Sequence, residues 1–191
     1  VNSSVLMNPE EAKKLLEESG WKDTDGDGYA DKDGQKLTIN WLTYPTRLEQ
    51  PKLAEYAQAT LKEIGIDLQV NNTSDHRTYA ENGDFDVYVS STTTAPTGDP
   101  EYFFTSTVTG AKNYGNYQNE EVTKLTDQLH QTFDKEKRGE LAVQLQQQIL
   151  DDDAFFFVSH LNMGIVTKSN VTGLEAHPCD YYEITADLDV N

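Results

Sequence analysis

The segment from residue 9 to residue 42 constrains the fold most, because a helix, an acidic loop and a strand follow one another with clear boundaries. Asn8 can cap the amino end of the helix, and Pro9 suits the first helical position, where its missing N–H costs nothing. Gly20 suits the left-handed conformation that often follows the last turn of a helix. The loop DTDGDGYADKDG comes next, and the β-forming run LTINWLTY follows it. We therefore predict a helix, a loop and a strand.

The next part of the chain alternates between helical and strand periodicity. Apolar residues recur at helical spacing over residues 48–64, and the alternating run IDLQVNN follows. Strand, helix and strand in this order favour a parallel pair with a right-handed crossover. Residues 74–82 predict a short helix that Ser74 can cap, and the mostly apolar run FDVYVSS predicts a third, central strand.

The second half combines a long loop, two helices and a tail. Residues 92–119 are rich in Thr, Gly, Pro, Asn and Tyr and hold at most one short helix near residues 101–106; loops of that length are usually functional. Helices are expected over residues 119–133 and 135–150, each with an apolar face. Three short strands are expected afterwards, in AFFFVSHLN, GIVTKSN and VTGLEAH.

Charge and cysteine content exclude several classes of protein. The 33 acidic and 15 basic residues give a net charge of -18, which repels nucleic acid and anionic lipid. Cationic ligands are more natural partners than anionic ones, but the charge by itself is better explained by the solubility of a secreted or surface protein. No apolar run approaches the roughly 18 residues of a membrane helix, and the first residues do not read as a signal peptide. Cys179 is the single cysteine, so we expect a partly buried thiol and no internal disulfide.

Several segments together resemble the second lobe of family 5 extracellular solute-binding proteins, the receptors of peptide and nickel ABC importers. They are AKKLLEESGW, LKEIGIDLQV, DFDVYVS, APTGDPEYF, NYGNYQNEEVTKL and VTGLEAHPCDYYEI, in this order. The resemblance implies an α/β fold: a type II periplasmic-binding-protein-like lobe, with a mixed sheet flanked by helices and a β-rich C-terminal tail. It also implies that residues 1–153 form the second lobe, that residues 154–191 are strands returning toward a first lobe, and that the first lobe and an export signal lie upstream.

The same resemblance bears on the ligand. Peptide receptors of the family carry an aspartate four residues before the proline of the Asp-Pro pair, where it holds the α-amino group of a peptide. Pro96 stands at that position, and a proline cannot form an ion pair. The Ala-Pro pair is similar to the nickel-type branch instead. Nickel receptors, however, place aromatic residues where this chain has Thr93 and Thr97, and a histidine near the position of Lys112.

These comparisons give candidate ligand contacts on the long loop. They are Thr93, Thr97, Asp99, Tyr102, Tyr114 and Tyr117, and Tyr181 and Tyr182 could join them. If a metal contacts this lobe, His160 and His177 are the candidate nickel ligands, because neutral imidazole is a common nickel donor. For each residue a purely structural role remains the alternative.

The acidic loop is a separate candidate metal site. Asp23, Asp25 and Asp27 alternate, and Asp31 stands at the ninth position, as in an EF-hand calcium loop. The twelfth position holds Gly34 instead of a bidentate glutamate, so any calcium affinity should be modest. The alternative is a solvated turn that needs no ion.

No sequence pattern supports catalysis. The chain lacks the GxSxG, HExxH, phosphate-loop and CxxC motifs. We therefore expect no enzyme and no required cofactor, but a monomeric, extracytoplasmic component of an ABC importer that captures nickel or a metal–metallophore complex. It would meet a permease and reach the membrane only through an anchor, as a lipoprotein or a periplasmic protein. The alternatives are an oligopeptide receptor of the same family and a calcium-stabilised surface module without a transport ligand.

Overall fold

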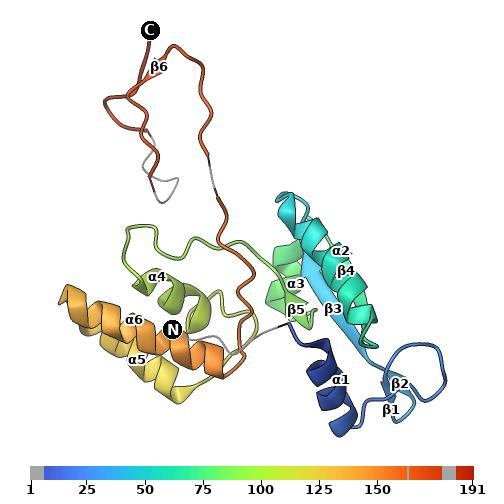
Figure 1. Cartoon of the computed structure of the whole chain (residues 1–191). Coiled ribbons are helices and arrows are strands. Elements are labelled where there is room, and N and C mark those ends of the chain that lie inside the picture. Colours follow the sequence, from blue (N-terminus) through green and yellow to red (C-terminus); the bar gives the residue numbers. More distant parts are fainter. Residues whose placement is uncertain (1–6, 163, 178–183) are drawn as a thin grey trace. The chain divides into compact units, whose positions relative to one another are not determined.

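The computed structural model describes residues 7–162, 164–177 and 184–191. The described residues form two compact units that divide between Ser91 and Thr92 (Figure 1). The boundary at residues 153 and 154, which separates the predicted lobe from predicted returning strands, stays a prediction.

The first unit, up to Ser91, is built on a small parallel sheet (Figure 1). Its strand order is β4-β3-β5, and β3 pairs in parallel with both neighbours. Helix α2 packs against β3 and β4, and helix α3 packs against β3. The elements are α1 (Pro9–Glu18), β1 (Asp31–Lys32), β2 (Gln35–Lys36), β3 (Thr38–Thr43), α2 (Glu49–Lys62), β4 (Asp67–Asn72), α3 (His76–Asn82) and β5 (Val87–Tyr88). The predicted parallel strand–helix–strand unit is therefore confirmed.

The local signals around α1 act as expected. The Asn8 side chain accepts a hydrogen bond from the N–H of Glu11 at 3.1 Å, and Gly20 has a φ of 89°. Gly65 has a second role, because a Cβ built there would lie 3.1 Å from the backbone nitrogen of Ala30. The N–H of Ala30 donates to the carbonyl of Gly65 at 2.7 Å, so the absence of a side chain lets the acidic hairpin join the sheet.

Two details of this unit differ from the sequence prediction. The central strand is β3, whereas FDVYVSS contributes only the two-residue strand β5 at an edge of the described sheet. The apolar residues of FDVYVSS are half-buried. Their composition therefore reflects burial on one face of the unit, and not the position of a central strand with helices on both faces. Helix α3 begins after Asp75 instead of Ser74, and the Asp75 side chain accepts from the hydroxyl of Thr78 at 2.7 Å.

The second unit, from Thr92, is centred on an antiparallel helix pair (Figure 1). Its helices are α4 (Glu101–Phe103), the π-helix η1 (Phe104–Val108), α5 (Glu120–Gln131) and α6 (Lys135–Asp151). Apolar residues recur with a three- and four-residue spacing on α5 and α6, which brings them to one face. The buried core consists of Phe104, Val108, Val122, Leu125, Leu129, Ala142, Leu145 and Ile149.

The tail after α6 holds less sheet than the sequence predicts. Among the described residues, β6 (Val171–Thr172) and β7 (Asp189–Val190) pair antiparallel, so VTGLEAH contains a strand. AFFFVSHLN and GIVTKSN are not strands in the described chain. Phe155 and Phe157 pack on the partly buried ring of Phe103, with ring centroids 5.9 and 6.0 Å away. They form no strand, because a β-forming sequence becomes a strand only beside a pairing partner.

The sequence predicts no membrane helix and a partly buried thiol at Cys179. No helix in the described part of the chain is long and apolar enough to cross a membrane. Cys179, Tyr181 and Tyr182 lie outside the described residues.

Candidate ligand-binding site

The predicted contact segment leaves β5 and leads to helix α4. Thr93 is half-buried and Thr97 is exposed. The N–H of Gly98 donates to the carbonyl of Ala95 at 3.0 Å, and the φ of 77° at Gly98 closes this turn. The turn delivers Asp99 to the amino end of α4, where its Oδ1 accepts from the N–H of Glu101 at 2.9 Å.

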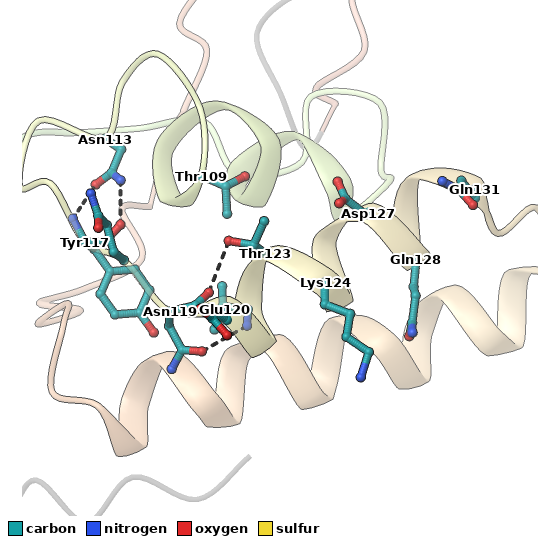
Figure 2. Close-up of a pocket in the computed structure, with 12 residues that line it drawn as sticks. Thr109, Asn113, Tyr117, Asn119, Glu120, Thr123, Lys124, Asp127, Gln128 and Gln131 are labelled. Carbon is teal, nitrogen blue, oxygen red and sulfur yellow. Dashed lines mark hydrogen bonds between the residues drawn. The ribbon is translucent and has the colours of Figure 1, made fainter.

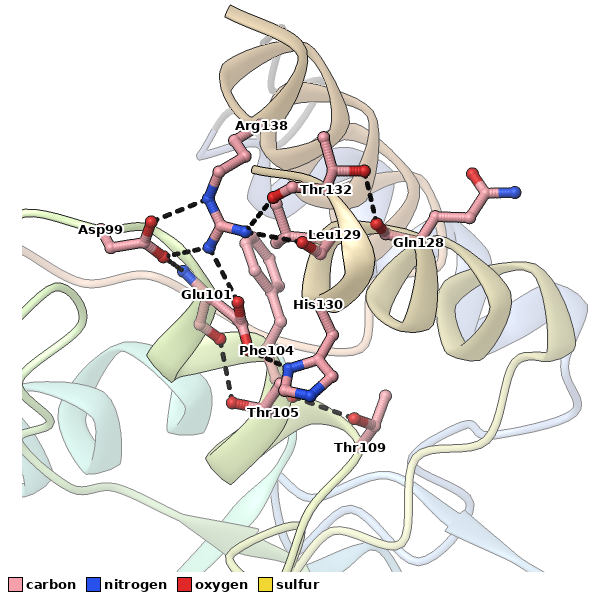
Figure 3. A network of polar contacts seen from close by, with 10 residues as sticks. All are labelled: Asp99, Glu101, Phe104, Thr105, Thr109, Gln128, Leu129, His130, Thr132 and Arg138. Atoms are coloured by element: carbon pink, nitrogen blue, oxygen red, sulfur yellow. Dashed lines mark hydrogen bonds and ion pairs between the residues drawn. The ribbon is translucent and has the colours of Figure 1, made fainter. Parts of the chain in front are cut away.

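Arg138 holds the end of this segment from helix α6 (Figure 3). Its Nε donates to Oδ2 of Asp99 at 2.9 Å, and its Nη2 donates to Oδ1 of Asp99 at 2.6 Å and to Oε2 of Glu101 at 2.7 Å. Its Nη1 donates to the carbonyls of Leu129 and Thr132, at 2.7 and 2.6 Å. A guanidinium has five N–H donors, so every donor has a partner here. The residue ties the segment before α4 to the carboxyl end of α5.

The electrostatics of this cluster favour its charged state. Hydrogen bonds from Arg138 lower the pKa of Asp99 and, together with one from His130, lower the pKa of Glu101. The Nδ1 of His130 lies 2.6 Å from Oε1 of Glu101. Asp99 and Glu101 therefore stay ionised at neutral pH and already share Arg138 as a cationic partner. Asp99 remains a predicted ligand contact, with both carboxylate oxygens engaged in this structure.

A hollow of about 720 Å³ runs along α5 beside the loop at residues 109–118 (Figure 2). It is lined by residues of mostly polar type, whose carbon atoms nevertheless supply most of its surface: Thr109, Asn113, Gln118, Asn119, Thr123, Gln128 and Gln131, with Tyr117, Glu120, Val122, Lys124 and Asp127. Asn113 shapes the loop, because its side chain accepts from the N–H of Tyr117 at 3.0 Å and donates to its carbonyl at 2.8 Å. Of the predicted contacts that the structure describes, Tyr117 alone borders this hollow.

The predicted tyrosine contacts have different environments. The hydroxyl of Tyr117 donates to Oδ2 of Asp152, which also accepts from Asn119 at 2.7 Å. Burial, followed by this carboxylate, raises the pKa of Tyr117. The hydroxyl of Tyr102 accepts from Lys112 at 3.2 Å. Tyr114 is half-buried on the same loop. Asp152 thus has a structural role, which explains one of the three consecutive aspartates at the end of α6.

The predicted metal ligands are not all brought together. Within the described residues, the one group of at least three potential ligands is Asp23, Asp25 and Asp27, all exposed. Asp31 is engaged elsewhere: its carboxylate accepts from the N–H of Thr24 at 2.9 Å and from the Thr24 hydroxyl at 2.5 Å. Asp27 forms an ion pair with Lys36 at 2.7 Å.

The two tail histidines belong to no such group. His160 and His177 are both exposed. Among the described residues, neither joins other histidine, cysteine or carboxylate side chains in a cluster. Their assignment as nickel ligands stays a prediction.

A polar cluster lies at the carboxyl edge of the parallel sheet. The Thr43 hydroxyl donates to Gln50 at 3.0 Å, and the Gln50 amide donates to Ser91 at 3.1 Å. The N–H of Ser91 donates to the Tyr44 hydroxyl at 3.0 Å. The ring of His76 stacks on Tyr44 beside this network. In open α/β sheets, ligands bind outside this edge.

The sequence comparison decides the family. Residues 2–115 match the bacterial extracellular solute-binding proteins, family 5, in their middle region. The match covers more than half of the chain. The chain belongs to this family.

Two relatives of this family 5 chain are named for different ligands. The oligopeptide-binding protein AppA of Bacillus subtilis is 30% identical over 183 residues, which cover 93% of this chain and 34% of AppA. The nickel-binding protein NikA of Staphylococcus aureus is 28% identical over 181 residues, or 93% of this chain and 35% of NikA. The family 5 chain thus spans about a third of the length of these curated relatives.

Solved structures of both relatives share the fold. AppA from Bacillus subtilis in complex with a nonapeptide matches with a TM-score of 0.64 and 32% identity, over 76% of this chain and 30% of that one. NikA from Staphylococcus aureus in complex with Ni(L-His)2 matches with a TM-score of 0.66 and 29% identity, over the same shares of 76% and 30%. The family 5 chain has the mixed α/β fold of a type II periplasmic-binding-protein-like lobe.

Sequence reasoning missed the most connected residue of the second unit. Arg138 stands among the charged residues DKEKRGE, which resemble a solvated helix face. Its partner Asp99 lies 39 residues earlier. A single sequence gives no signal for this pairing, although the Asp-Pro pair at residues 99 and 100 does mark the start of α4.

Proposed function

We propose that this chain is the second lobe of the substrate-binding component of an ABC importer and that its ligand is nickel or a metal–metallophore complex. Membership of the extracellular solute-binding family supports the receptor role and an extracytoplasmic location. Binding without catalysis fits the names of the relatives, which are binding proteins. The partner would be a permease that recognises the closed receptor, and the receptor would be a monomer attached through a lipid anchor or free in the periplasm.

A metal is favoured over a peptide because the carboxylates near the Ala-Pro pair are already paired with Arg138. A peptide ammonium needs an available carboxylate. Pro96 supplies none, while Asp99 and Glu101 are held by Arg138 at 2.6 and 2.7 Å. An ammonium would have to displace a guanidinium that makes five hydrogen bonds. A metal that arrives with its own chelator needs no carboxylate from this segment.

The contacts in this proposal come from the long loop. Thr93 and Thr97 would offer hydroxyl groups, and Tyr102, Tyr114 and Tyr117 would offer rings and hydroxyls to a flat chelate. Residues 154–191 would return toward another lobe, which would supply the opposite wall. Hinge closure over the ligand would then create the surface that the permease binds.

Calorimetry tests this proposal directly. The native protein that contains this chain is titrated with nickel plus free histidine, and separately with a mixed oligopeptide pool. Histidine-dependent nickel binding with no peptide heat is the expected result. Peptide heat without a nickel response would overturn the metal assignment.

The second candidate ligand is an oligopeptide. The similarity to AppA, at 30% identity over 93% of the chain, favours it. In that case the peptide would be held by backbone hydrogen bonds, because the amine-binding acid is replaced by Pro96. The same titration separates the two candidates.

A further inference from the structure

Three residues from three consecutive strand ends meet at the carboxyl edge of the β4-β3-β5 sheet. Tyr44 follows β3, Tyr88 ends β5, and His76 begins α3 soon after β4. The imidazole of His76 stacks on Tyr44 with a centroid distance of 4.1 Å and an interplanar angle of 25°. Its Nδ1 lies 2.7 Å from the hydroxyl of Tyr88. The stacking on Tyr44 fixes the plane of the imidazole, and the contact with Tyr88 fixes its rotation within that plane.

The surroundings of His76 favour a neutral ring. Burial lowers the pKa of the imidazole, and the adjacent Arg77 lowers it further, while Asp75 opposes both. The rings of Tyr44 and Tyr88 both lie against the imidazole. When Nδ1–H donates to the Tyr88 oxygen, the lone pair of Nε2 remains available. Among the described residues, Tyr88 is the one hydrogen-bond partner of this imidazole.

The sheet edge also has a rigid support under the stacked ring. Tyr44 is 8% exposed, and its hydroxyl accepts from the N–H of Ser91 at 3.0 Å. Ser91 connects through Gln50 to the hydroxyl of Thr43, which is fully buried. A half-exposed imidazole on such a support keeps its direction without a ligand, which reduces the entropy lost on binding.

We propose that His76 is a ligand-contacting residue whose Nε2 donates to a late divalent transition metal of the nickel class, with Tyr88 orienting the ring through Nδ1. The inference rests on the proposed capture of nickel and names one residue that would perform it. Imidazole is a preferred donor for nickel, and a hydrogen bond at the second ring nitrogen is the usual device for orienting it.

The donor set determines the form in which the metal arrives. In the described part of the chain, His76 is in no group of three potential ligands, so this unit supplies one strong donor. A nickel ion needs several more. The metal would therefore come as a chelate with a vacant coordination position, and His76 would fill that position. This arrangement differs from the pair of tail histidines, His160 and His177, which are exposed.

Histidine NMR of the full chain tests the proposal with nickel nitrilotriacetate as the probe, because this chelate leaves coordination positions open. Long-range 1H–15N spectra resolve the imidazoles, and His→Gln variants assign them. Paramagnetic broadening should reach His76 at the lowest probe concentration. The proposal would be overturned if the signals of His160 or His177 broadened first, or if His76→Gln left the affinity for the probe unchanged.

Two variants separate metal contact from folding. Tyr88→Phe keeps the ring and removes the acceptor for Nδ1, so the affinity should fall by about 10–100-fold, the usual effect of losing such a partner. Tyr79→Phe is the matched control, because Tyr79 lies on the same helix as His76 but is 38% exposed, and it should leave the affinity unchanged. Backbone amide spectra verify that each variant is folded; an unaltered affinity in Tyr88→Phe would contradict the orienting role.

The proposal and the proposed function fail in different ways. If the unsubstituted native protein binds nickel with histidine and His76→Gln binds it equally well, the function stands and the role of His76 is wrong. If the unsubstituted protein gives no nickel response, the proposed function itself fails.

Discussion

Arg138 binds Asp99 through two nearly parallel hydrogen bonds, from Nε at 2.9 Å and from Nη2 at 2.6 Å, across 39 residues of sequence. The same guanidinium reaches Glu101 and two carbonyls at the end of α5. A cation at this position also complements the negative end of the helix dipole. This one side chain therefore determines where the predicted ligand segment ends and α4 begins.

Replacement of Arg138 should destabilise the second unit. Arg138→Met leaves two carboxylates close together without a cation and leaves the carbonyls of Leu129 and Thr132 without these donors. We expect the free energy of unfolding to fall by about 2–3 kcal/mol, the usual scale for hydrogen bonds to charged groups. Urea denaturation measures it. Lys137→Met is the control, because Lys137 is exposed on the same helix, and a loss equal to that of Arg138→Met would contradict the account.

Acid should weaken the same cluster. The pKa values of Asp99 and Glu101 are lowered in the folded protein, chiefly by hydrogen bonds from Arg138. A carboxylate with a lowered folded pKa stabilises the protein above its unfolded pKa, about 4, and loses that contribution as the pH falls toward the folded value. The stability of the native protein should therefore drop more steeply below about pH 4 than that of Asp99→Asn/Glu101→Gln. Equal slopes in thermal melts would contradict the prediction.

Tyr117 should be the tyrosine whose hydroxyl contributes to stability. Tyr117→Phe removes the hydrogen bond to Asp152 at the end of α6 and should lower the free energy of unfolding by about 1 kcal/mol. Tyr102→Phe is the matched control, because its hydroxyl bonds an exposed lysine, and it should cost less. The raised pKa adds an optical test: the absorbance change lost in Tyr117→Phe should occur above about pH 10. A Tyr117 that ionises with the exposed tyrosines would be inconsistent with this contact.

The elements of this fold were largely predictable because local chemistry specifies them. Several signals depend only on residues that are close in sequence. They are the Asn8 cap, the positive φ at Gly20 and the apolar faces of α5 and α6. Strand position depends on distant partners instead. FDVYVSS has the composition of a central strand but lies at an edge, and AFFFVSHLN lacks a pairing partner in the described chain.

The candidate site was less predictable for the same reason. Its loop could be located from length and composition, since residues 92–119 hold few helix or strand signals. The contacts of Asp99 and His76 join residues that are far apart in sequence: Asp99 and Arg138 are separated by 39 positions, and His76 and Tyr88 by 12. A lone histidine at a helix start gives no sign that a parallel sheet will place it beside two tyrosines.

The acidic loop provides a test of calcium binding. Asp23 and Asp25 already accept backbone N–H groups, and Lys36 lies 2.7 Å from Asp27, where it competes with a cation. We expect weak calcium binding in calorimetry, tightened by Lys36→Met and weakened by Asp23→Asn. Lys32→Met, a nearby lysine outside this ion pair, is the control. An affinity that Lys36→Met leaves unchanged would show that any calcium lies elsewhere.

Native mass spectrometry of the receptor, purified from cells grown in nickel-supplemented medium, distinguishes a nickel chelate from a peptide, because it weighs the captured ligand together with the protein. We expect an added mass with the isotope pattern of nickel and a small chelator, which disappears on treatment with a strong competing chelator. A ladder of added peptide masses without nickel would contradict it and assign the protein to the oligopeptide receptors.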